Sequence, residues 1–83
     1  MDIKTFHTAQ ELNNKIYSTE QEIRKIKRAI EISKAVDRIF VNFDKESRLV
    51  LKIKSSLIIA ALEADLADFE KELSNLQYRF NQI

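Results

Sequence analysis

The residues that could take part in acid-base or nucleophilic chemistry are few, and the sequence does not bring them together. The single histidine, His7, precedes the first predicted helix, and its neighbours supply no partner for a metal site or a pH switch. A hydrolase-type serine nucleophile needs a strained turn flanked by glycine, and the chain contains no glycine. We therefore expect a solvated or capping histidine, no catalytic residues and no enzyme activity.

A group of acidic residues in the C-terminal half has the side-chain type that binds divalent cations. At helical spacing, Glu63 and Glu70 share one face, whereas Asp65, Asp68 and Glu72 share another. Neither a histidine nor a glycine-containing loop accompanies these carboxylates. We interpret them as solvated charged faces and expect no metal site and no cofactor.

A basic set offers a different chemistry, because closely spaced Lys and Arg side chains neutralise phosphates. Its members are Arg24, Lys25, Arg28, Arg38, Lys52 and Lys54. Acidic residues, among them Glu31 and Asp37, interrupt the run, as they do on many solvated helix flanks. The set predicts two alternative functions: nucleic-acid binding, or capture of a small anionic ligand at an oligomer interface by Arg24, Arg28 or Arg38.

Composition limits the remaining classes. The 83 residues, 45% hydrophobic and 33% charged, suit one domain and carry a net charge of only +1. The absence of cysteine removes disulfides and thiolate metal sites, so a cytoplasmic location is the default expectation. The longest apolar run, Leu57 to Leu62, is too short to cross a membrane, and no secretion signal is evident.

Heptad patterns predict two helices, over about residues 8–35 and 55–82. The first would begin at a capping box, Thr8 to Glu11, and the second at a cap on Ser55 or Ser56. The first heptad stripe contains Leu12, Ile16, Thr19, Ile23, Ile26, Ile30 and Ser33. The second contains Ile59, Leu62, Leu66, Phe69, Leu73, Leu76, Phe80 and Ile83.

Between the helices, an alternation of period two predicts a β-hairpin over about residues 38–54 with a turn at residues 44–47. Pairing positions whose numbers sum to 92 places Ile39 opposite Ile53, Val41 opposite Leu51, and Phe43 opposite Leu49. Asp44 would then face Arg48. The same sum also pairs each residue of the first heptad stripe with a residue of the second. The pairing of the strands and the pairing of the helices are therefore both centred near Glu46 in the sequence.

These patterns predict a mainly α fold, an antiparallel two-helix coiled-coil hairpin with a β-hairpin at the bend. Charge also fits one flank, where Lys27 and Lys34 would lie near Glu63 and Glu70. An all-α long helical hairpin is the alternative, because residues 36–51 also fit a helical stripe and the turn lacks a glycine.

The predicted hairpin leaves apolar side chains that the helices do not cover, which favours assembly with another copy. The predicted oligomer interface combines hairpin positions with a stripe of small residues on the second helix. It comprises Ile39, Val41, Phe43, Leu49, Leu51, Ile53, Leu57, Ala60, Ala64 and Ala67. Small residues allow close helix packing, as in a four-helix dimer, although alanine also simply raises helix propensity.

The order helix, β-hairpin, helix resembles that of the β-type subunits of prefoldin, whose hairpins assemble into barrels that carry coiled-coil arms. The resemblance covers about residues 8–83 and is one of architecture, without a shared motif. It implies that the hairpin is the assembling element. We therefore predict a non-catalytic module that forms a dimer or larger oligomer and binds a partner protein, as an assembly factor, an adaptor or a small inhibitor of the kind that phages encode.

Overall fold

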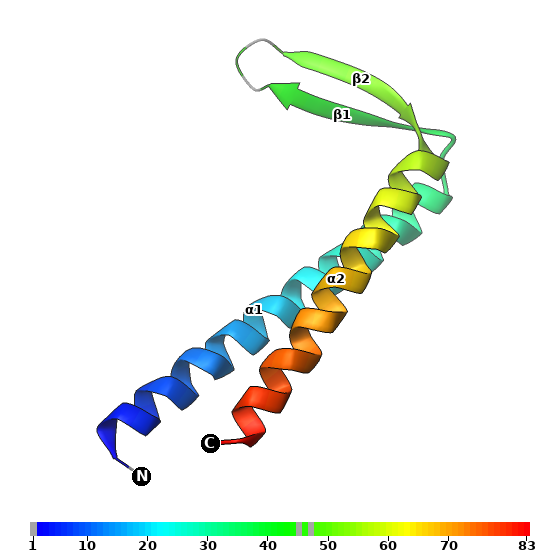
Figure 1. Ribbon diagram of the computed structural model, residues 1–83. Coiled ribbons are helices and arrows are strands. Elements are labelled where there is room, and N and C mark those ends of the chain that lie inside the picture. Colours follow the sequence, from blue (N-terminus) through cyan, green and yellow to red (C-terminus); the bar gives the residue numbers. More distant parts are fainter. Residues whose placement is uncertain (1, 45, 47) are drawn as a thin grey trace.

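The computed structural model describes residues 2–44, 46 and 48–83 and shows the predicted helix, hairpin, helix order (Figure 1). Its elements are α1 (Ile3–Lys34), β1 (Arg38–Asp44), β2 (Leu49–Lys54) and α2 (Ser55–Asn81). The strands pair antiparallel into a two-stranded sheet. The fold is therefore mainly α with a β-hairpin at the bend, and the all-α alternative is wrong.

The molecule has the shape of a hook. α1 and α2 lie side by side in opposite directions, with both termini at one end, and the hairpin projects from the other end at an angle to the helices (Figure 1). The radius of gyration is 17.5 Å, against about 12 Å for a compact domain of this length. Much of the chain is therefore remote from any central core.

The core is the seam between the helices, and its buried residues all belong to the predicted heptad stripes. Phe80 and Ile83, the last two members of the second predicted stripe, are exposed and lie outside the core. Its buried hydrophobic residues are Leu12, Ile23, Ile26, Ile30 and Leu76. Thr19 and Ser33 are buried at the polar positions of the α1 stripe, and the Ser33 hydroxyl donates to the Ala29 carbonyl at 2.7 Å. That hydrogen bond satisfies the buried hydroxyl within its own helix.

α1 begins six residues earlier than the capping box predicts. Asp2 is the N-cap, and its carboxylate accepts a hydrogen bond from the Thr5 amide at 2.7 Å. The hydroxyl of Thr8 instead donates to the Lys4 carbonyl, one turn back within the helix. The predicted cap at Thr8 is wrong because Asp2 offers the stronger, charged acceptor to the free amides of the first turn.

α2 begins without the serine cap that the sequence predicts. Lys54 occupies the N-cap position and makes no side-chain capping hydrogen bond, while Ser55 is already helical. The Ser55 amide donates to the Asp37 carbonyl at 2.9 Å. The backbone leading into β1 thus satisfies one free amide of α2, so the strand continues directly into the helix.

The hairpin has the predicted register over most of its length. Ile39 pairs with Ile53 and Val41 with Leu51, as the sum of 92 requires. Beyond Asn42 the ladder shifts by one residue, and Asp44, not Phe43, lies opposite Leu49. The predicted pairs of Phe43 with Leu49 and of Asp44 with Arg48 are therefore wrong.

A local polar contact explains this β-bulge. The Asn42 side-chain oxygen accepts from the Asp44 amide at 3.1 Å, so that amide has a partner two residues back. The Arg48 amide donates to the Asp44 carbonyl at 3.0 Å, and Arg48 has a φ of 57°, the left-handed position where glycine is preferred. Lys45 and Ser47 of the predicted turn lie outside the described residues.

Candidate interaction surfaces

One face of the hairpin is lined with large apolar side chains. Strand alternation places Ile39, Val41, Leu49, Leu51 and Ile53 on it, and we call these five residues the apolar hairpin face. Ile39, Val41 and Ile53 are half-buried near the base of the hairpin, whereas Leu49 and Leu51 are exposed, Leu51 at 48%. The face is therefore covered at its base and open toward its tip.

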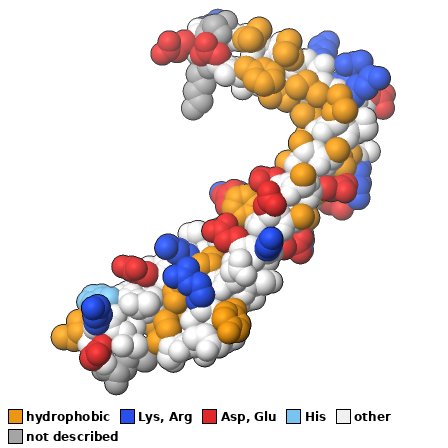
Figure 2. Space-filling model, viewed as in Figure 1, with side chains coloured by type: hydrophobic (Ala, Val, Ile, Leu, Met, Phe, Trp, Pro, Cys, Tyr) orange, Lys and Arg blue, Asp and Glu red, His pale blue; other side chains and the backbone are white. Residues whose placement is uncertain are grey.

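Phe43 and the start of α2 extend the exposed apolar surface. Phe43, in the bulge, is 58% exposed, and Leu57, three residues beyond β2, is 61% exposed. Figure 2 shows hydrophobic side chains gathered over the hairpin and continuing toward the bend. Patches of this kind are rare on soluble monomers and are typical of interaction sites.

The predicted small-residue stripe is also at the surface. Ala60, Ala64 and Ala67 are exposed on α2, and Ala64 lines a shallow groove with Leu62. The larger seam residues of α2 are themselves incompletely covered, because Leu62, Leu66, Phe69 and Leu73 are only half-buried. α2 therefore offers apolar contact area beside the stripe.

The structure divides the predicted basic set into two groups. Arg24, Lys25 and Arg28 are exposed along the middle of α1, where Lys25 forms an ion pair with Glu22 at 3.3 Å. Arg38, Lys52 and Lys54 are at the base of the hairpin, where Arg38 pairs with Lys54 across the strands. The set is thus not one continuous site.

An exposed aromatic residue, Phe40, lies beside the cations at the base of the hairpin, and it was not among the site residues predicted from the sequence. Phe40 pairs with Lys52, and the Lys52 ammonium lies 5.4 Å from the centre of the Phe40 ring. The side chain of Phe40 is 69% exposed. The predicted register already contained this pair, because the numbers of Phe40 and Lys52 also sum to 92. Strand alternation then places both residues on the face opposite to Val41 and Leu51.

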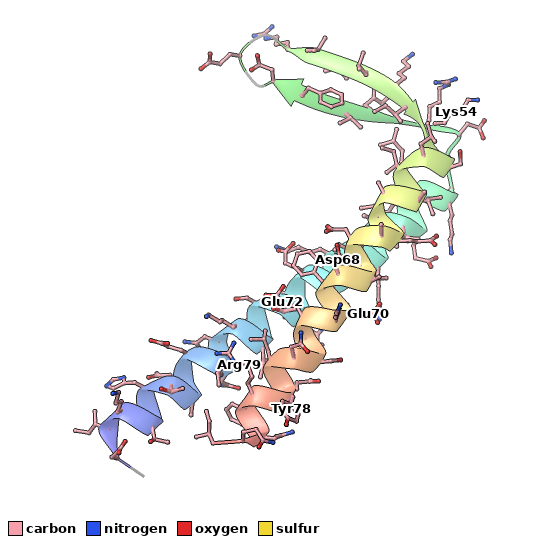
Figure 3. The ribbon with its side chains drawn as sticks, viewed as in Figure 1. Lys54, Asp68, Glu70, Glu72, Tyr78 and Arg79 are labelled. Atoms are coloured by element: carbon pink, nitrogen blue, oxygen red, sulfur yellow. The ribbon has the colours of Figure 1, made fainter. Side chains whose placement is uncertain are left out.

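The carboxylates of α2 do not converge. A spacing of two residues puts Glu70 across the helix from both Asp68 and Glu72 (Figure 3). Over residues 2–44, 46 and 48–83, no three His, Cys, Asp or Glu side chains are grouped closely enough to hold a metal ion. His7 is exposed, with its ring 6.0 Å from that of Phe6 in an edge-on arrangement.

Charged residues of both helices line one groove, as the predicted charged flank requires, but they do not form the expected contacts between the helices. Lys27, Lys34 and Glu63 line one groove, but Lys34 has its ion pair with Glu31 of its own helix, at 4.0 Å. In the described part of the chain, no ion pair joins α1 to α2. The helices are held together by the apolar seam.

Comparison of the chain with protein-family models, curated proteins and solved structures finds no match. Among the described residues, neither helix has the length and apolar character needed to cross a membrane.

Proposed function

We propose that the chain is a non-catalytic interaction module that assembles with copies of itself through the apolar hairpin face, together with Phe43 and Leu57. The occupant of this surface is a second copy of the same chain. The observation that carries the proposal is the amount of apolar surface that one copy leaves exposed.

The surface area of a single copy supports assembly. The chain exposes 6824 Å² at a mass of 9.7 kDa, whereas a folded monomer of that mass exposes about 5,100 Å². The difference is about twice the ~800 Å² that each partner buries in a standard protein interface. This excess of exposed area supports the proposal that one copy is a subunit of a larger assembly.

The hairpin would be weakly held in a lone chain. A two-stranded sheet is marginal in water unless its apolar face packs against something. Leu49, Leu51 and Phe43 are each about half exposed or more, and full burial of such a side chain stabilises by about 1.5 to 3 kcal/mol. Covering them supplies a driving force comparable to a large part of a small domain's stability.

A second copy is the occupant that fits this surface best. An apolar face can form a self-complementary interface about a two-fold axis, in which each residue contacts the symmetry-related part of the same patch. Both strands of a two-stranded sheet are also edge strands, so two hairpins can pair edge to edge or pack face to face. Exposed Ala64 and half-buried Phe69 would extend such an interface along α2.

A pair of aspartate substitutions at adjacent hairpin positions tests the proposal. Val41→Asp places a charge on the apolar hairpin face, whereas Asn42→Asp places the same charge on the opposite face and keeps the acceptor for the Asp44 amide. We expect Val41→Asp to weaken self-association about 100-fold or more, because a buried unpaired charge costs several kcal/mol. Asn42→Asp should assemble as the wild type does. Light scattering gives the mass, and circular dichroism confirms that the helices persist.

Two results would contradict the proposal. An assembled Val41→Asp protein with the wild-type mass would place the interface elsewhere, and α2 would be the next surface to test through Ala64→Glu. Equal loss of assembly in both variants would mean that added charge on the hairpin, and not the apolar face, controls the mass.

A further inference from the structure

The face of the hairpin opposite to the apolar hairpin face combines positive charge with an exposed ring. Arg38 pairs with Lys54 and Phe40 with Lys52, so strand alternation puts all four on one side. We call these four residues the basic-aromatic face. Asn42 and Val50, which pair with each other, lie on the same side of the sheet. None of these six residues is acidic.

The cations of this face differ in their ion pairing from those of α1. Within the residues that the structure describes, Arg38, Lys52 and Lys54 form no ion pair, unlike Lys25 and Lys34 on α1. The Arg38 guanidinium donates through Nη1 to the Lys52 carbonyl at 3.1 Å, which holds it over the strands. Figure 3 shows Lys54 where β2 joins α2, at the outside of the bend. Three cations therefore lie within two paired rows of the hairpin, where they can attract an anion.

Phe40 adds an apolar, flat contact to that charge. The ring is 69% exposed, and the Lys52 ammonium lies over it at 5.4 Å from the ring centre. An ammonium over an aromatic ring is attracted to its π-face and fixes the orientation of both groups. A flat ring beside unneutralised cations matches a ligand that carries both a planar base and a phosphate.

We propose that the basic-aromatic face binds single-stranded nucleic acid, with a base stacked on Phe40 and the adjacent phosphates against Lys52, Lys54 and Arg38. Stacking requires an unpaired base, which selects a single strand over a duplex. The site is independent of self-assembly, because Phe40 and Lys52 lie on the other side of the sheet from Val41 and Leu51.

Fluorescence anisotropy with labelled oligothymidylate and oligouridylate of about 20 nucleotides tests this inference on the full chain. We expect binding of both, weaker at about 200 mM than at about 50 mM salt, with a slope of log K against log salt near −2 per bound chain for three phosphate contacts. Tighter binding of one oligomer would assign the ligand as DNA or RNA. Binding of neither at low salt would overturn the proposal.

Substitutions separate stacking from charge. Phe40→Leu keeps an apolar side chain and should weaken binding about 5- to 150-fold, the loss of one base-aromatic stack. The double substitution Lys52→Gln and Lys54→Gln should reduce the salt slope by about 1.4. Lys71→Gln with Arg79→Gln removes the same charge from α2, beginning about 25 Å along the helix from Lys54, and should leave the slope unchanged.

Three outcomes would overturn the proposal even if the protein binds nucleic acid. Unchanged affinity after Phe40→Leu would show that charge alone acts. Equal competition by a duplex or by polyphosphate would exclude recognition of an unpaired base. Loss of mass together with loss of binding in Phe40→Leu, measured by light scattering, would assign Phe40 to the oligomer interface.

Discussion

At the scale of single residues, short polar side chains decide where the elements of this chain begin and where they lose register. Asp2 caps α1 by accepting from the Thr5 amide, and Asn42 shifts the ladder by accepting from the Asp44 amide. Each contact spans two or three residues. Such local hydrogen bonds compete with helix and sheet pairing, so they set boundaries that hydrophobic periodicity does not.

The Asp2 cap makes the first turn of α1 sensitive to acid. Its hydrogen bond from the Thr5 amide, followed by one from the Thr5 side chain, lowers the pKa of the Asp2 carboxyl below its ordinary value. Because the folded pKa is depressed, the stabilisation is complete above the ordinary pKa and is lost as pH falls through the lowered value. The protection of the Thr5 amide, measured by NMR as its exchange rate relative to the intrinsic rate at each pH, should therefore decrease below the ordinary Asp pKa.

Asn at the same position is the matched control, because it caps as well as Asp and does not titrate. In Asp2→Asn, exchange at Thr5 should lose this added acid dependence, apart from the intrinsic effect of pH on exchange. The same acid dependence in both proteins would show that another group controls the first turn.

At the scale of elements, the heptad and period-two patterns predicted both helices, both strands and the strand register from Arg38 to Asn42. The reason is that burial in the seam requires apolar side chains at Leu12, Ile23 and Leu76, and pairing across a hairpin fixes which positions meet. The bulge at Phe43 and the start of α1 were not predictable in this way, because they depend on the side-chain geometry of Asn42 and Asp2. The pattern also does not show which surfaces other molecules cover.

Leu76 tests the claim that the seam holds the helices together. It is the buried hydrophobic residue of α2, at 5% exposure, so Leu76→Ala should lower the free energy of unfolding by about 2 to 5 kcal/mol. Tyr78→Ala, two residues further along and exposed, should change it by no more than about 0.5 kcal/mol. Urea unfolding followed by circular dichroism measures both.

Similar losses in the two variants would show that α2 is not anchored through the buried seam in solution. A loss in Tyr78→Ala alone would instead indicate that the exposed side of α2 is covered by another copy.

At the scale of the whole molecule, the elongated shape of the hook decides which side chains are buried and which stay uncovered. A narrow helical pair of this length buries a line of side chains and leaves the hairpin at its end without a second layer. The hairpin's two faces differ in chemistry, one apolar and the other basic with an exposed Phe40. Under the two proposals, the apolar face joins copies of the chain and the basic face binds a charged ligand.

The sequence predicted the existence of an uncovered apolar face, because the heptad stripes and the hairpin could not cover one another. It did not predict the basic-aromatic face as a unit, because the six basic residues were grouped by charge and not by strand alternation. Placing Phe40 beside Lys52 required the register to be applied to both sides of the sheet.

The most direct test of self-assembly is the mass of the wild-type chain, measured by light scattering and sedimentation equilibrium from about 1 µM to about 1 mM. The account predicts a mass of at least two copies of the 9.7 kDa chain, with dissociation on dilution. A folded 9.7 kDa monomer at every concentration would contradict it.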